Sequence, residues 1–284
     1  MTLKNRFLAG ATAVAAIAAA GPALADHAWS NYHWSTPDGV VTIPVVDNTT
    51  GDWRPRVQLA VSDWNKSAHI DSAYDPNGTN NNRRCSMIQD TIQVCNSAYG
   101  NTGWLGIASI SLSGGHIVAG TTKLNDTYFA YPQYNNEADK QLVTCQEIGH
   151  DYGLGHQNED FNTDATDSCM EYTSDSTNNT QPDFHDYAML DLIYGHNEGG
   201  TTGGGGGDPA PCKGRGCKGK SLGFGVGNTQ AEWGRAVGYD AQNRPNVFKT
   251  NINGYEVVTH VTWAPDARRN TDPGNPHDHD DHTH

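Results

Sequence analysis

Short apolar runs rich in β-branched residues mark the expected strands of this chain. They alternate with turn signals, such as the polar stretch Tyr99–Gly103 and the pair Gly114–Gly115. Runs of this length between glycine-rich turns are typical of strands. The segments expected to be strands are Val40–Val46, Thr91–Val94, Leu105–Leu112 and His116–Ala119.

Apolar residues at helical spacing predict three helices. In Arg56–Lys66, the residues Val57, Ala60, Val61 and Trp64 fall on one face. Strands followed by helices in this order predict an α+β fold, in which helices pack on a mixed twisted sheet and a long helix forms the floor of a cleft. The other two expected helices are Glu137–Gly153 and Asp183–Tyr194.

A change in composition near residue 199 divides the chain. Residues 199–210 are dominated by glycine and predict a flexible linker. We therefore expect a main domain over residues 26–198, a small β-rich module over 211–265 and a disordered tail rich in His and Asp over 266–284. Strands of the module are expected in Gly223–Val237, Val247–Lys249 and Tyr255–Trp263.

The N-terminal 25 residues have the pattern of a secretory signal. Lys4 and Arg6 precede the apolar run Leu8–Ala20, and Ala23–Ala25 supplies a small-residue cleavage site. No later apolar run is long enough to span a bilayer. We expect an exported protein, either extracellular or periplasmic, that acts as a monomer.

Cysteine usage and net charge agree with export. The six cysteines allow disulfides in an oxidising compartment, and the simplest pairing joins neighbours along the chain. The formal net charge of −14 gives little electrostatic reason to bind nucleic acid or anionic lipid. The expected pairs are Cys85–Cys95, Cys145–Cys169 and Cys212–Cys217.

The most informative chemistry lies in residues 145–156, with the sequence CQEIGHDYGLGH. Positions 146 and 150 share one helical face, so Gln146 and His150 are placed to bind one ion. Glu147 is beside them, as a base that takes a proton from metal-activated water needs to be. Gly153 permits a sharp turn that brings in His156 as a third ligand.

This segment resembles the metzincin zinc-peptidase motif H-E-x-x-H-x-x-G-x-x-H, with Gln146 in place of the first histidine. The segment Ser168–Tyr172 (SCMEY) is similar to the Met-turn of the same family. The resemblance implies a bound Zn²⁺, an apolar floor provided by Met170, and Tyr172 as a residue that assists the transition state. It covers about residues 28–196 and implies a metzincin-like sheet.

An upstream segment resembles the substrate-binding edge strand of the matrixin branch of that family. The residues are Gly103–Ala108, and an edge strand there offers unpaired backbone groups to an extended peptide. The implied partner is a peptide or protein substrate. The residues expected to hold it are Leu105, Gly106, Ile107 and Ala108.

The substitution at Gln146 leaves two functions open. An amide oxygen is a much weaker zinc ligand than imidazole, so the metal site is weaker unless Tyr172, His185 or Asp186 compensates. The first function is a secreted zinc endopeptidase that uses Glu147 as general base. The second is an inactive relative that binds peptide or metal.

Two other segments offer metal ligands. Asp75, Asn77 and Asn80 could bind Ca²⁺, but the acidic spacing of a calcium loop is missing, so an exposed turn is the preferred interpretation. The His/Asp tail at 276–284 could bind transition metals, although no fold fixes its geometry.

Overall fold

The computed structural model describes residues 27–163, 165–196 and 219–265 of the 284-residue chain. The predicted signal segment 1–25, the linker 199–210, the pair Cys212–Cys217 and the tail 266–284 lie outside the described residues. In the described part, none of the helices has the length and apolar character that a membrane span requires.

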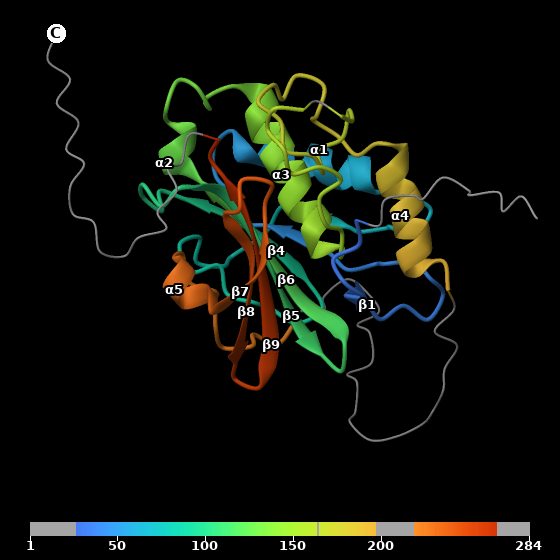
Figure 1. Ribbon diagram of the computed structural model, residues 1–284. Coiled ribbons are helices and arrows are strands. Elements are labelled where there is room, and N and C mark those ends of the chain that lie inside the picture. The colour runs from blue at the N-terminus through green and yellow to red at the C-terminus, as the bar shows by residue number, and fades with distance from the viewer. Residues whose placement is uncertain (1–26, 164, 197–218, 266–284) are drawn as a thin grey trace, which may run out of the picture.

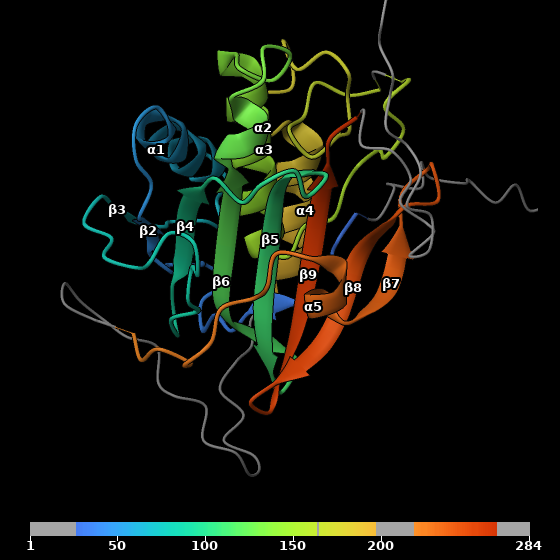
Figure 2. The same ribbon diagram turned by 90° about the vertical axis from the view of Figure 1, so that its left-hand side faces the viewer.

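One mixed nine-stranded sheet runs through the whole described chain. The strand order is β3-β2-β4-β6-β5-β9-β8-β7 (Figure 2). The short β1 pairs with the start of β6. The strands are β1 His33–Trp34, β2 Val45–Asp47, β3 Tyr74–Asp75, β4 Ile92–Ser97, β5 Trp104–Ser113, β6 His116–Asn125, β7 Arg235–Tyr239, β8 Pro245–Ile252 and β9 Tyr255–Trp263.

The sheet changes direction at β5. The strands β2, β3, β4 and β6 pair in parallel, whereas β5 is antiparallel to both β6 and β9. β9, β8 and β7 continue the sheet as an antiparallel meander. The sheet is thus mixed, as the α+β prediction requires.

Helices cover both faces of the sheet and enclose a core on each. α1 and α3 pack on one face, together with α4, while the short α5 lies on the other (Figure 1). The first core contains Trp64, Ile148 and Met170, and the second contains Trp104, Phe248 and Val261. The helices are α1 Trp53–Trp64, α2 Asp126–Phe129, α3 Glu137–Asp151, α4 Phe184–Tyr194 and α5 Gln230–Trp233.

The three long helices match the predicted segments, whereas strand lengths differ. β2 is shorter than the predicted Val40–Val46, because only its last residues join the ladder. β6 is longer than His116–Ala119, because its polar end is buried with partners. Thr122 donates to Asp151 Oδ2 at 2.9 Å, and Lys123 Nζ contacts the backbone oxygen of Val226. Apolar periodicity does not reveal a strand whose buried side chains are polar.

The C-terminal strands differ from the expected separate module. β9 pairs with β5 along eight registered residue pairs, from Trp104↔Trp263 to Leu112↔Glu256. The described residues of 219–265 therefore extend the main sheet and share its cores. The glycine-rich composition of 199–210 predicted a boundary, but a change in composition carries no information about strand pairing across it.

The same pairing gives β5 a different position from the one expected. Leu105, Ile107 and Ala108 are buried, and β5 lies between β6 and β9 rather than at an edge. Its backbone groups are therefore used within the sheet. The segment predicted to hold substrate is covered by the chain's own C-terminal strand.

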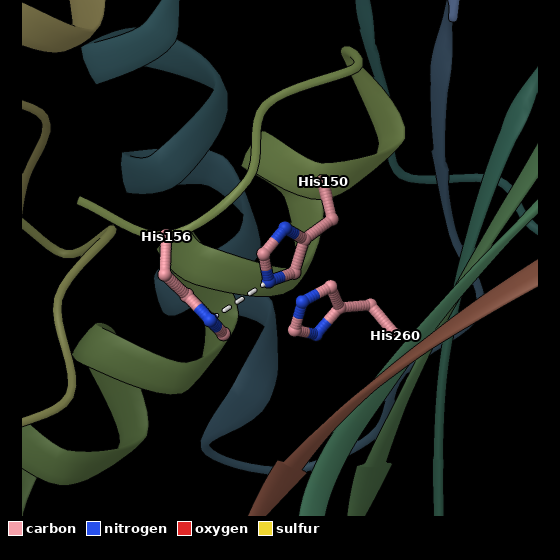
Figure 3. Close-up of side chains that lie close together, drawn as sticks. All are labelled: His150, His156 and His260. Atoms are coloured by element: carbon pink, nitrogen blue, oxygen red, sulfur yellow. Dashed lines mark hydrogen bonds between the residues drawn. The ribbon is translucent and has the colours of Figure 1, made fainter. Parts of the chain in front are cut away.

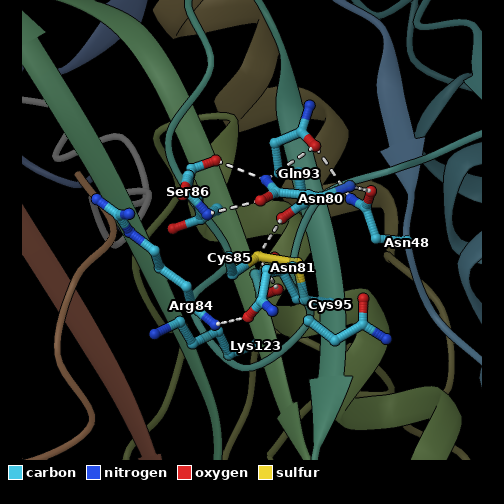
Figure 4. The surroundings of a disulfide bond; sticks show 12 residues. Asn48, Asn80, Asn81, Arg84, Cys85, Ser86, Gln93, Cys95 and Lys123 are labelled. Atoms are coloured by element: carbon cyan, nitrogen blue, oxygen red, sulfur yellow. Dashed lines mark hydrogen bonds between the residues drawn. A yellow bond between two sulfur atoms is a disulfide. The ribbon is translucent and has the colours of Figure 1, made fainter. Parts of the chain in front are cut away.

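Both neighbour disulfides that fall in the described residues are present: Cys85–Cys95 and Cys145–Cys169. Around the first, the amide of Asn80 donates to the Ser86 backbone oxygen at 2.7 Å and to Gln93 Oε1 at 3.3 Å (Figure 4). The disulfide Cys85–Cys95 ties the long polar loop that precedes β4 to that strand. The second disulfide joins α3 to the turn that carries Met170.

The continuous sheet predicts that the described chain unfolds as one unit. Val261→Ala removes two methyl groups from a fully buried site on β9 and is expected to destabilise the whole protein by about 2 kcal/mol. Urea unfolding curves recorded by tryptophan fluorescence and by circular dichroism should coincide, and the substitution should move both midpoints to lower urea concentration by the same amount. The control Asn251→Ala, at an exposed position on β8, should change stability by less than about 0.5 kcal/mol. Separate transitions for β7–β9 and for the rest would contradict this.

Candidate metal centre

The long helix α3 presents His150 at its C-terminal turn. Asn136 caps the N-terminus of the helix, because its side chain accepts from the backbone N–H of Asp139 at 2.9 Å. Trp64 Nε1 donates to the Cys145 backbone oxygen at 3.0 Å and anchors the middle of α3 to α1. His150 is fully buried as a result.

A glycine turn then carries the chain from His150 to His156. Gly153 has φ +92°, a conformation that favours glycine, and a Cβ there would collide with the Tyr32 backbone oxygen. Its N–H donates to the His150 backbone oxygen at 2.9 Å. The turn that the sequence predicted is therefore present, and it directs His156 back toward α3.

Three histidines from three segments converge at this point. Figure 3 shows the rings of His150 on α3, His156 on the following loop and His260 on β9 pointing toward one another. One nitrogen from each lies within 4.8 Å of the others. The Nε2 atoms of His150 and His156 are 3.1 Å apart, and the His260 ring stacks on His150 at a centroid distance of 4.0 Å.

Hydrogen bonds fix which nitrogens face the centre. His150 Nδ1 lies 2.8 Å from the Leu154 backbone oxygen, and His156 Nδ1 lies 3.1 Å from Glu159 Oε1. Both oxygens can accept from a ring Nδ1–H. The facing Nε2 atoms are hydrogen-bonded to each other, and a metal ion at this point would take the Nε2 lone pairs of the neutral rings. Nδ1 of His260 is buried and has no hydrogen-bond partner within the described part of the chain.

Burial keeps two of these imidazoles neutral. It lowers the pKa of His150 well below its usual value, and the neighbouring His156 lowers it further. Burial likewise lowers the pKa of His260. Neutral imidazole is the form that binds metals, and three histidines are a donor set typical of Zn²⁺. The chemistry of the cluster thus fits the metal that the sequence implied.

A carboxylate and an amide support His156 from behind. Glu159 Oε1 accepts from both His156 and Asn246 Nδ2, the latter at 2.9 Å. Burial alone would raise the pKa of Glu159, but the hydrogen bonds from His156 and Asn246 hold it below its usual value. A carboxylate in this position orients a metal-binding histidine and increases its basicity. Asn246 belongs to β8. The C-terminal strands therefore contribute to the centre in two ways, through His260 on β9 and through Asn246 on β8.

Gln146 is buried next to the histidines with its amide fully engaged. Nε2 donates to the backbone oxygens of Cys169 and Glu171 at 2.9 and 3.2 Å, and Oε1 accepts from Thr262 at 2.7 Å. The side chain therefore joins α3, the Met170 turn and β9. A histidine at this position could not donate to two carbonyls and accept a third bond.

Glu147 lies on the side of α3 that faces β5. A Cβ on Gly106 would fall 2.5 Å from Glu147 Oε1, so the carboxyl group packs directly against the strand. The side chain is fully buried, and its carboxyl oxygens have no hydrogen bond of good geometry among the described residues, although the Thr262 hydroxyl and the Ala108 backbone N–H lie close enough to lower its pKa. Burial raises the pKa of Glu147 well above its usual value.

The turn that carries Met170 packs against α3. Met170 Sδ packs against Gly149, and the backbone N–H of Met170 donates to Ser168 Oγ at 2.8 Å. Tyr172 is fully buried beside His156, at a centroid distance of 4.2 Å. Its hydroxyl donates to the Val261 backbone oxygen of β9 at 3.2 Å.

Sequence reasoning missed His260. It lies about 100 positions after the motif, inside the region expected to be a separate module. One signal was available, because in the strand sequence VVTHVTW a histidine occupies an inward position among valines. A buried histidine in a chain that lacks one motif ligand is a candidate replacement.

The other candidate ligands lie apart from the cluster. His185 stacks on His27 at 4.8 Å, and Asp186 accepts from Ser168 at 2.6 Å. In the loop considered for Ca²⁺, Asp75 accepts from Asn77, whereas Asn80 bonds to Ser86 and to strand residues. Within the described ranges, the three histidines form the one group of metal-binding side chains found.

Comparisons with known proteins give only remote likeness. No protein-family profile and no curated protein matches the chain. A solved structure titled "Structure of myroilysin" is similar at 14% identity, covering 60% of this chain and 98% of that chain with a TM-score of 0.34. A second, "Crystal structure of myroilysin", gives 13% identity, 66% and 100% coverage and a TM-score of 0.31. Likeness at this level carries no argument about the site.

The geometry predicts opposite roles for His260 and Gln146. His260→Ala removes an imidazole from the centre and should weaken Zn²⁺ binding by about 100-fold or more, which corresponds to roughly 3 kcal/mol. Gln146→Ala should leave two buried backbone oxygens without donors and lower stability by about 2–4 kcal/mol, with less effect on zinc affinity. Competition with a chromophoric chelator and urea unfolding measure the two quantities. A large loss of zinc affinity in Gln146→Ala, with none in His260→Ala, would reverse the assignment.

Proposed function

We propose that the protein is a zinc-dependent endopeptidase whose metal is held by His150, His156 and His260. The observation that carries this proposal is the convergence of three histidines one helical turn from Glu147, with the motif histidine that is absent at position 146 replaced by one from β9. A site that only bound metal would have no need of a carboxyl group in the position of the general base.

The roles of the residues follow from their positions. Zn²⁺ bound to the three histidines would supply a Lewis acid for water and for a peptide carbonyl. Glu147, one helical turn before His150, is placed to accept a proton and later donate it to the leaving amine. Tyr172 already donates its hydroxyl to a backbone carbonyl, so it is suited to stabilise an oxyanion. Glu159 positions His156.

A second candidate is an exported protein that binds metal without catalysis. The burial of Glu147, His150 and Tyr172 under β9 favours it, because a substrate and its water need a path to the metal. The two candidates share the metal centre and differ in the role of Glu147. A variant at that residue therefore separates them.

Glu147→Gln is expected to fold, retain zinc and lose peptidase activity by at least about 100-fold, the scale for a lost general base. The effect is measured as the rate at which wild type and variant hydrolyse a denatured protein substrate. Each is assayed untreated, with chelator, and again after zinc is restored. Glu137→Gln makes the same chemical change at the start of α3, far along the helix from the site, and should retain activity.

Undiminished hydrolysis by purified Glu147→Gln would refute the role of this residue. Zinc binding at one ion per chain without cleavage of any substrate by the wild type would favour the second candidate.

A further inference from the structure

β9 occupies the place beside β5 that an extended peptide would fill. It runs antiparallel to β5, with Gly106 opposite Thr262 and Ala108 opposite His260. These are the residues of β5 that the sequence marked for substrate binding. An extended segment bound in this way uses every second side chain to reach one face of the sheet.

The α3-facing side chains of β9 reach the site directly. His260 joins the histidine cluster, and Thr262 donates to Gln146 Oε1. Between them, the backbone oxygen of Val261 accepts from the Tyr172 hydroxyl. One strand therefore supplies a metal ligand, engages the substituted motif residue and presents a peptide carbonyl to the residue suited to stabilise an oxyanion.

We propose that β9 is a built-in inhibitory strand, which lies in the peptide groove of the proposed peptidase and is held there by the bond between His260 and the metal. The inference rests on the proposed function and names the regulation of that same site. The site opens only when the end of β9 separates from β5.

The end of β9 is also fastened outside the site. Trp263 Nε1 donates to the Pro245 backbone oxygen at 2.9 Å, and the backbone N–H of Ala264 donates to Gly103 at 2.9 Å. Arg244 donates to the Ala264 oxygen at 3.2 Å. Of these bonds, only the one from Ala264 to Gly103 crosses to β5 and breaks with the His260 contact, whereas the bonds of Trp263 and Arg244 hold the end of β9 to β8.

Opening has a second consequence for the metal centre. Departure of β9 removes His260, and it also removes the Thr262 hydroxyl from Gln146 Oε1. In that open form a bound metal would keep His150 and His156 and could gain the freed amide oxygen of Gln146, so the three-histidine set belongs to the closed resting form of the proposed peptidase and hydrolysis to the open one. Strand opening and weakened zinc binding are therefore one event, and the rate of zinc release reports how often β9 opens.

A disulfide across β5 and β9 tests this coupling. Ser109 and Thr259 are directly paired, with their hydroxyl oxygens 2.9 Å apart. They alternate with Ala108 and His260 along the strands and so lie on the opposite face of the sheet from α3. The full-length double variant Ser109→Cys/Thr259→Cys, oxidised and loaded with Zn²⁺, fixes β9 in place. Each single variant is the matched control.

The primary readout is the rate at which zinc passes to excess chelator. The locked protein is expected to release zinc at least about 10-fold more slowly than either single variant, and to cleave no protein substrate. Equal release rates, or failure of the two cysteines to form a bond in the folded protein, would overturn the proposal. Slow release in the locked form with no hydrolysis in any variant supports the strand's closure while refuting peptidase function.

Hydrogen exchange on the unmodified chain provides a second test. Zinc should slow exchange of the β9 amides from Val258 to Thr262 by at least about 10-fold in the wild type. It should have no such effect in His260→Ala. Identical exchange with and without zinc in the wild type would mean that the metal does not hold β9.

Discussion

The antiparallel pairing of β9 with β5 is the constraint on which the candidate site depends. It makes the C-terminal strands part of the main sheet, and it places His260 opposite Ala108, where its ring meets those of His150 and His156. Without this pairing the motif on α3 has only two histidines. With it, the site has three, but β5 loses its free edge.

The local part of the site was predictable from the sequence, and the distant part was not. The spacing from Glu147 to His156 depends only on helix geometry and on the conformation of Gly153, both of which are encoded within a dozen residues. The disulfide between Cys145 and Cys169 followed from neighbour pairing. His260 is positioned by strand pairing across a long connection, and one sequence does not reveal which strands pair.

Buried polar residues account for the other differences between the predictions from sequence and the structure. β6 continues through Thr122 and Lys123 because each has a buried partner, and apolar periodicity gave no sign of it. Gln146 was interpreted as a weakened ligand because of its position in the motif. In the structure its amide satisfies two backbone oxygens of the Met170 turn and a hydroxyl of β9, a role that imidazole could not fill.

The central claim is that the metal ligand absent from the motif is supplied by β9. X-ray absorption at the zinc edge of the loaded full-length protein tests it most directly, because imidazole rings give a characteristic scattering pattern whose amplitude scales with their number. The account predicts three imidazoles per zinc in the wild type and two in His260→Ala. Two imidazoles in both proteins would contradict it.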